Sequence, residues 1–434
     1  MNAATLRRPA ILAGGLALAA VTATAPFAAA GDEEPTGPHN EQVALVNETG
    51  AQPGDGTKSH INGTAQVTSY NGGYVVFSTD AALVPWDDND TDDVYLRSRP
   101  DGVTVLVSGK GQTVGNDASF EPTISDDGRF VAYSTFSTNL AKKTGSEAVD
   151  VVVRDMQGQK TVLVSQSTAG KAGKRNSFFP VISGNGRHVS FQTFSQLGKK
   201  DQDRKEDVYV RDLKKATTRQ ASLLPGASSD VRGSVLNGDI SDNGRRVTFG
   251  NAEMLWMRDM KAGRTIRFHH EPTSAPCQPF PDLASAGRPV ISGDGKYAAF
   301  STCAADLAGD GADFTDIFRI DLATGEIERL TEGNGHSYLP SLSRDGRYLG
   351  FGSEASDLVE GDDEGQPDAF RMDLATGEVL RASQGPDGAG GNSLNATTGA
   401  AISGDGHSLV YPSYSQNLVA GDISDWEEVF FWHD

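Results

Sequence analysis

The chain has 434 residues, with 38 Lys and Arg against 58 Asp and Glu, and a formal net charge of −20. Nucleic acids and anionic membranes are bound through basic patches, so this balance argues against both as partners and favours cationic ones. The 50 glycines indicate many tight turns, which are typical of an all-β chain of short strands.

The N-terminus has the pattern of a secretory signal peptide over residues 1–30. Arg7 and Arg8 precede an apolar stretch, and small residues end it at Ala28–Ala30. This order predicts cleavage before Gly31 and a flexible segment over residues 31–41. No later stretch is apolar for long enough to span a bilayer. We therefore expect an exported, soluble monomer in the periplasm, the cell envelope or the medium.

One hairpin motif recurs seven times along the chain. Its copies begin at Val67, Ile124, Ile182, Ile240, Ile291, Leu342 and Ile402, so the gaps are 57, 58, 58, 51, 51 and 60 residues. A fixed period of this size indicates an array or a propeller.

The sixth copy shows the unit clearly. A first strand ends at residues 342–343, Asp345-Gly346 forms a two-residue turn, and residues 348–351 form the second strand. An acidic loop leads to a third strand at 369–373, and the turn at Thr376-Gly377 leads to a fourth at 378–381. Asp-Gly pairs favour hairpins because both residues tolerate positive φ. Four antiparallel strands per unit, repeated radially, predict an all-β, seven-bladed β-propeller.

The two ends of the repeat array predict how the ring closes. The seventh copy stops after its third strand, and residues 42–46 resemble the fourth strand of blade two, residues 160–164. An open array would leave two unpaired sheet edges, which proteins avoid. The N-terminal strand Val43–Val46 should therefore pair with Val429–Trp432, and the propeller should occupy residues 42–434.

The repeat resembles a known family. The pattern (P/I)-S-x-D-G-(R/K)-x-(V/L)-x-F, followed by D-(V/I)-(Y/F)-V-R-D and a Thr-Gly turn, is similar to the TolB-type, WD40-like β-propeller repeat. The resemblance extends over all seven copies and implies the fold, not the function. It departs from TolB, which has six copies and an N-terminal domain, so a role in the Tol system is not carried over. Nor does a hydrolase domain follow, as it does in prolyl-oligopeptidase-like enzymes.

Acidic loops between the second and third strands suggest one functional surface. In the closed ring, blades five, six, seven and one are neighbours, so their loops should form one negatively charged arc. Carboxylate oxygens suit Ca²⁺, the one candidate cofactor. The alternative is that Asp, Asn and Gly fill exposed turns and keep the protein soluble. The candidate metal ligands are Asp87, Asp88, Asp90, Asp92, Asp362, Asp363, Asp422 and Asp425.

Aromatic residues on the same side suggest a ligand-binding face for sugars or peptides. The alternative is that these rings fill the gaps between blades. The candidates are Trp86, Phe120, Phe178, Tyr338 and Trp426.

The only two cysteines, Cys277 and Cys303, fall on one face near blade five. Export to an oxidising compartment favours a disulfide between them. The alternative is two free buried thiols.

Catalytic motifs are absent from the sequence. It contains no G-x-S-x-G and no zinc-like histidine spacing. Acidic pairs are so numerous that no acid/base pair can be selected. We therefore expect a non-enzymatic binding or scaffold module that binds a protein or carbohydrate through the acidic loop face. The alternative is a hydrolase or lyase that acts on carbohydrate or peptide in the central pocket, where polar groups with shifted pKa values would converge.

Overall fold

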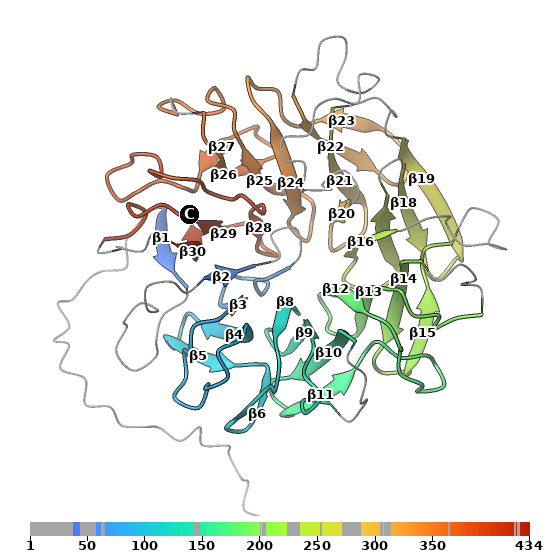
Figure 1. The fold of residues 1–434 in the computed structure, drawn as a ribbon. Coiled ribbons are helices and arrows are strands. Elements are labelled where there is room, and N and C mark those ends of the chain that lie inside the picture. The colour runs from blue at the N-terminus through green and yellow to red at the C-terminus, as the bar shows by residue number, and fades with distance from the viewer. Residues whose placement is uncertain are drawn as a thin grey trace, which may run out of the picture. The chain divides into compact units, whose positions relative to one another are not determined.

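A computed structural model describes residues 38–43, 58–61, 66–141, 148–199, 201, 205–223, 235–251, 254–270, 288–303, 307, 314–362, 365–420, 422 and 426–434. All named elements in these ranges are β-strands. They form seven four-stranded antiparallel sheets and one small hairpin, β6–β7. Figure 1 shows the sheets following one another around a common centre, which confirms the seven-bladed propeller.

Each blade uses four strands, numbered here in chain order. Blade one contains β2 (Ser59–His60), β3 (Tyr74–Thr79), β4 (Asp93–Ser98) and β5 (Val103–Leu106). Blade two contains β8 (Ser119–Ile124), β9 (Phe130–Thr135), β10 (Asp150–Asp155) and β11 (Lys160–Leu163). Blade three contains β12 (Ser177–Ile182), β13 (His188–Thr193), β14 (Asp207–Asp212) and β15 (Thr217–Gln220). Blade four contains β16 (Leu236–Ile240), β17 (Arg246–Gly250), β18 (Met254–Asp259) and β19 (Arg264–His270).

The remaining blades follow the same plan. Blade five contains β20 (Val290–Ile291), β21 (Tyr297–Thr302), β22 (Asp316–Asp321) and β23 (Ile327–Arg329). Blade six contains β24 (Ser337–Leu342), β25 (Tyr348–Ser353), β26 (Asp368–Asp373) and β27 (Val379–Arg381). Blade seven contains β28 (Ala401–Ile402), β29 (Ser408–Ser413), β30 (Glu428–His433) and the N-terminal β1 (His39–Gln42). The small hairpin joins β6 (Gly109–Lys110) to β7 (Thr113–Val114).

The N-terminal strand closes the ring, but with a different segment from the predicted one. In blade seven β1 pairs with β30, His39 opposite His433 and Gln42 opposite Phe430 (Figure 1). The prediction of closure is confirmed, whereas the choice of Val43–Val46 as the strand is wrong. Val43 follows the strand, where its N–H donates to the Val429 carbonyl over 2.9 Å, and Ala44–Val46 lie outside the described residues. The fourth strand of a blade is its outer edge, so the polar segment HNEQ suits it better than an apolar one.

The start of the propeller therefore lies earlier in the sequence than the predicted residue 42. Residues 39–41, expected in the flexible segment, belong to blade seven. The predicted signal peptide lies outside the described residues and stays a prediction. Within the described ranges, no helix has the length and apolar character needed to cross a membrane.

The blades are also linked by a ring of backbone hydrogen bonds, one at each junction, formed by the turns between first and second strands. Each bond joins the turn of one blade to the turn of its neighbour, at 2.8–3.4 Å. In order, the bonds are Tyr70 N to Asp126 O, Asp126 N to Gly184 O, Asn185 N to Asp242 O, Asp242 N to Gly293 O, Asp294 N to Arg344 O, Arg344 N to Gly404 O and Asp405 N to Tyr70 O. We call this ring the collar. Its last bond returns to blade one, so it closes independently of β1.

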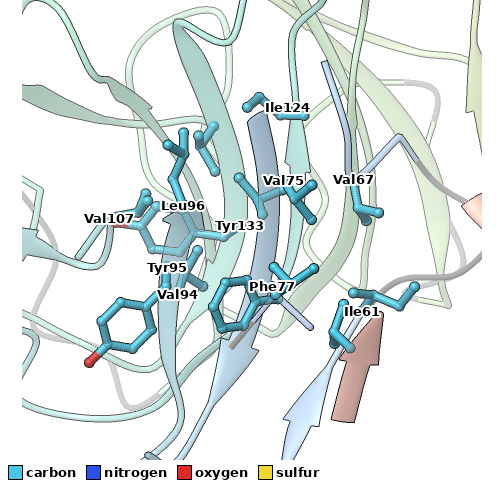
Figure 2. Close-up of a cluster of buried hydrophobic side chains, with 14 of the residues drawn as sticks. Ile61, Val67, Val75, Phe77, Val94, Tyr95, Leu96, Val107, Ile124 and Tyr133 are labelled. Carbon is cyan, nitrogen blue, oxygen red and sulfur yellow. The ribbon is translucent and has the colours of Figure 1, made fainter. Parts of the chain in front are cut away.

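The core of each blade is built on its second and third strands. Phe77 of β3 lies opposite Tyr95 of β4, with ring centroids 6.0 Å apart, and both are buried (Figure 2). The same stacked pair recurs in five further blades. These are the aromatic positions of the repeat pattern. Such cross-strand aromatic pairs stabilise a sheet and bury large apolar area.

Two other repeat positions have structural roles. The Arg that follows the Asp-Gly or Asn-Gly turn pairs with the Asp that ends the third strand, as in Arg129–Asp155 and Arg347–Asp373 at 2.6–2.9 Å. The Asp that opens the third strand is buried and accepts a hydrogen bond from a Ser or Thr 15 residues later. The residues of this second kind are Asp93, Asp150, Asp207, Asp316 and Asp368.

Candidate functional sites in the channel and between the blades

The first strands of neighbouring blades lie side by side and enclose the central channel. Four of the segments that line it contain a non-glycine residue with positive φ: Glu121 (55°), Phe179 (49°), Leu339 (50°) and Ala396 (49°). Where β8, β12 and β24 pair with their second strands, the register shifts at this point. Positive φ is costly for such residues and is often found at functional sites. The bulges therefore make the channel a candidate functional site.

One end of the channel holds a half-buried acid–base pair, Glu121 and Arg288. Glu121 Oε2 accepts hydrogen bonds from Ser134 Oγ and from the backbone N–H of Phe179, each over 2.8 Å. Burial raises the pKa of Glu121. The Arg288 guanidinium lies 3.5 Å above the Phe179 ring. Burial lowers the pKa of Arg288 to about 10, although the nearby Glu121 and Glu206 favour its charged form.

Polar side chains extend this group across blades three and four. Gln192 Nε2 donates to Glu206 Oε1 over 2.9 Å. Gln192 Oε1 accepts from the N–H of Asn237, whose side-chain amide donates to the Phe179 carbonyl over 2.9 Å. The network fixes Phe179, and with it the platform on which Arg288 lies.

The other end of the channel, inside the collar, is crossed by an ion pair. Arg344 of blade six donates to Asp126 of blade two over 2.8 Å and lies 3.0 Å from Asp242 of blade four. Gln66 donates to the same Asp126 carboxylate over 2.7 Å. Blades two and six lie on opposite sides of the ring, so Arg344 spans the channel.

Little space remains behind this ion pair. A cavity of about 20 Å³ is lined by residues that include Gln66, Asp239 and Arg344. It can hold about one water molecule. Burial raises the pKa of Asp239 to about 6, even though it accepts hydrogen bonds from Ile240 N and Ile291 N. Among the described residues, the space behind the ion pair is therefore far too small for a substrate.

The predicted aromatic face is only partly present. Trp86 is exposed, and Trp426 lies under the Lys58 ammonium at 5.4 Å. Phe120 and Phe178 are half-buried, beside Phe136 and Phe179 respectively. Tyr338 is 1% exposed, so its assignment to a ligand-binding face is wrong. Its ring packs over Gly352 on the neighbouring strand, where a Cβ atom would collide with it.

The acidic loops are less uniform than predicted. Asp87 accepts a hydrogen bond from the Tyr95 hydroxyl, and burial raises the pKa of both Asp87 and Asp92. Asp362, a predicted metal ligand, is buried 3.4 Å from Arg381. Asp88 and Asp90 are exposed, whereas Asp422 is buried. Asp363 and Asp425 lie outside the described residues. In the described ranges, no three His, Cys, Asp or Glu side chains could hold a metal ion together, which leaves the Ca²⁺ prediction without support.

The cysteine prediction is tested in part. Cys303 is disulfide-bonded. Cys277 lies outside the described residues, so the pairing of these two residues stays a prediction.

Larger hollows lie between the blades. Two, of about 530 and 580 Å³, are on the side of the loops between second and third strands. Two others, of about 430 and 540 Å³, are on the collar side, between blades one and two and between blades three and four. The last is lined by Lys215, Arg219 and Lys261. The sequence-based predictions did not include this cleft, although the basic turns in DLKKATTR and DMKAGRT are visible signals.

Comparison with known proteins supports the fold alone. No protein-family profile matches the chain, and no curated protein matches it. An oligogalacturonate lyase in complex with manganese is similar to it, with a TM-score of 0.54, 12% identity and coverage of 87% of this chain and 90% of that one. An oligogalacturonate lyase from Vibrio parahaemolyticus has a TM-score of 0.53, 10% identity, and coverage of 91% and 96%.

Solved TolB structures are among the matches too. A putative TolB from Agrobacterium tumefaciens has a TM-score of 0.41, 16% identity, and coverage of 76% and 94%. A structure from a study of two prolyl endopeptidases has a TM-score of 0.52, 12% identity, and coverage of 86% of this chain but 50% of that one.

Proposed function

We propose that the protein is an exported, non-enzymatic binding module whose ligands occupy its outer surface. The observation that carries this proposal is the ion pair of Arg344 with Asp126 and Asp242, which crosses the channel at the collar. It leaves a cavity of about 20 Å³ behind it, whereas small-molecule sites usually have about 300–1,000 Å³. The hollows between the blades reach that size.

A protein or glycan partner would bind on the side of the loops between second and third strands, here called the loop side. Trp86 is exposed there, and Asp88, two residues later in the sequence, is exposed too. An aromatic ring offers a large apolar contact at low entropic cost, and carboxylates attract cationic groups. A partner with basic residues fits this surface best.

A second candidate, a hydrolase or lyase, is favoured by Glu121. Its strained backbone, its burial and the nearby Arg288 are what an acid–base catalyst needs. The oligogalacturonate lyases and prolyl endopeptidase that share the fold suggest the substrates to try, namely oligogalacturonate and peptides.

One set of proteins separates the two candidates. Purified wild type, Glu121→Gln and Trp86→Ala are incubated with oligogalacturonate and with a peptide library, and product formation is followed. The same three proteins, immobilised, are used to capture partners from the medium and envelope of the exporting cell. A binding module gives no turnover, and its capture of a reproducible partner is lost in Trp86→Ala but kept in Glu121→Gln. Turnover abolished by Glu121→Gln would overturn the proposal in favour of an enzyme.

A further inference from the structure

The cleft between blades three and four differs in charge from the rest of this acidic protein. It has a volume of about 540 Å³. Blade three provides His188, Asp212, Lys215 and Arg219, and blade four provides the turn at residues 243–245 and Lys261. Six of the side chains that line it are Lys, Arg or His, against one carboxylate.

The carboxylate in the cleft is already satisfied. Asp212 forms two hydrogen bonds with Arg187, at 3.1 and 2.8 Å. It also accepts hydrogen bonds from the backbone N–H groups of Lys214 and Lys215. On the other wall, Arg245 is paired with Asp259. Arg187 and Arg245 therefore belong to the repeated Arg–Asp pairs and are not available to a ligand as unpaired charges.

Three other cations have no such partner. Lys215, Arg219 and Lys261 are exposed, and none forms an ion pair within the described part of the chain. Arg219 also lies close enough to Arg258 to add to the lowering of the Arg258 pKa that burial causes. Positive charges held close together without a nearby carboxylate attract anions.

A matched cleft in the same molecule shows that this charge is not imposed by the fold. The cleft between blades one and two is built from the equivalent positions. Both contain the turn glycine (Gly128, Gly244), the paired Arg and a Met. Strand alignment places Asp101 where blade three has Lys215, Val105 where it has Arg219, and Gln157 where blade four has Lys261.

The remaining differences have the same direction. Asp127 is replaced by Asn243, so a carboxylate gives way to an amide. Asn243 Oδ1 accepts hydrogen bonds from Arg245 N and Ser241 Oγ, which leaves its NH₂ group as the donor. These four changes each remove an acidic or apolar group or add a hydrogen-bond donor, as an oxyanion site requires.

We propose that the cleft between blades three and four binds a small anionic ligand through Lys215, Arg219 and Lys261, and that the ligand bears a phosphate, sulfate or carboxylate group. The net charge of the protein and the volume of the cleft limit the size of this ligand. The protein's net charge of −20 repels long polyanions, whereas an ion within the cleft is screened from distant carboxylates beyond about 8 Å at physiological salt. The cleft volume lies in the range of small-molecule sites.

This inference goes beyond the proposed function because it adds an anionic ligand at a second, separate site, and it is tested with purified full-length protein. Inorganic phosphate, inorganic sulfate and citrate are titrated by calorimetry into wild type, Lys261→Gln and the triple variant Lys215→Asp, Arg219→Val, Lys261→Gln. The triple variant introduces the residues of the matched cleft. Lys160→Gln is the control because Lys160 is also an exposed lysine, at the start of the fourth strand β11 and outside the cleft.

We expect at least one anion to bind to wild type and to Lys160→Gln with equal affinity. Lys261→Gln should weaken binding about fivefold, as for one charged contact, and the triple variant should lose it. The preferred anion identifies the ligand's charged group. No binding by wild type, or equal weakening in Lys160→Gln, would overturn the inference. Capture of a partner through the loop side would then still stand, so the two proposals fail separately.

Discussion

The two clefts on the collar side have the same frame and different linings. In both, the ring or imidazole that opens a second strand (Tyr74, His188) packs over the turn glycine of the next blade (Gly128, Gly244), where a Cβ atom would collide with it. These glycines also have positive φ, of 71° and 67°. The frame therefore depends on the repeat, while the residues between its fixed points are free to differ. Function should lie in those residues.

The distinction between frame and lining gives an order of expected effects. Changes to the frame should alter the stability of the whole ring, because every blade depends on its neighbours. Changes to a lining should alter binding at one cleft and leave stability nearly unchanged.

Deleting His39–Val43 should have the largest effect, and it should damage both clefts alike. The deletion exposes the edge of β30, removes the Glu41–Arg99 ion pair of 2.8 Å between blades seven and one, and leaves buried polar groups without partners. We expect aggregation, or a Tm lower by about 10 °C or more. Size-exclusion chromatography and differential scanning calorimetry measure both.

The matched control for this deletion is the removal of Gly31–Pro38, which precedes β1 and should leave the Tm unchanged. If both truncated proteins melted like the full-length one, the collar alone would hold the ring closed. The frame would then not include β1.

Replacing Arg344 with Ala should have the next largest effect. It leaves Asp126 and Asp242 facing each other within the channel without their shared cation, and burial already raises the pKa of Asp242. Because the ion pair is mostly buried, we expect a loss of about 2–3 kcal/mol in the free energy of unfolding, measured by urea denaturation.

The control is Arg347→Ala, three residues away, which breaks the pair with Asp373 and should lower the free energy of unfolding far less, because the exposed Arg347 guanidinium is screened by solvent. Equal losses in the two variants would mean that the ion pair across the channel contributes no more than a surface pair. The channel could then open at little cost, which would favour the enzyme candidate.

The sequence predicts the repeated frame of the molecule well and its non-repeated features poorly. The period and the turn chemistry are local, so the seven blades, the third-strand Asp residues and the need for a closing strand could be derived from them. The segment used for closure could not, since an edge strand needs no apolar pattern and His39–Gln42 is polar. The Arg344 ion pair joins residues 218 positions apart, at turn positions that vary between copies, and no local pattern signals it. Tyr338 looked exposed because the bulge that follows it is invisible in the sequence.

The frame should also determine how stability depends on pH. Burial raises the pKa of Asp93 to about 7, and that of Asp368 to about 6, from an ordinary value near 4. The folded protein thus binds protons that the unfolded chain has released, so stability should fall as pH rises from about 4 to 7. We expect the Tm at pH 7.5 to lie about 2–4 °C below that at pH 5.

Asp93→Asn should reduce this slope, since Asn does not titrate, while Asp88→Asn, at an exposed position of the same blade, should not. Below pH 4 the trend should reverse, because pairing with Arg347 lowers the pKa of Asp373 to about 2 and this stabilisation is lost on protonation. A Tm that rises steadily from pH 5 to pH 7.5 would show that the buried carboxylates are not the dominant titrating groups.

The smallest effect on stability is expected when the cleft between blades one and two receives the three cations of the cleft between blades three and four. This variant is also the sharpest test of the comparison between the two clefts. Asp101→Lys, Val105→Arg and Gln157→Lys place three cations at the positions that Lys215, Arg219 and Lys261 occupy. The Asp101–Ser98 hydrogen bond is lost, at a cost of about 1 kcal/mol. Because the two frames match, the transplanted cleft should bind the anion preferred by the native one.

Calorimetry on this variant should report two sites where wild type has one, with the second affinity within about tenfold of the first, or about 1.4 kcal/mol. The neutral triple variant Asp101→Ser, Val105→Thr, Gln157→Ser controls for the loss of the original side chains and should report one site. A single site in both variants would mean that the three cations are insufficient. Binding by the native cleft would then also depend on His188 or Asn243, which this variant does not introduce. Lining and frame would be less separable than the matched geometry of the two clefts implies.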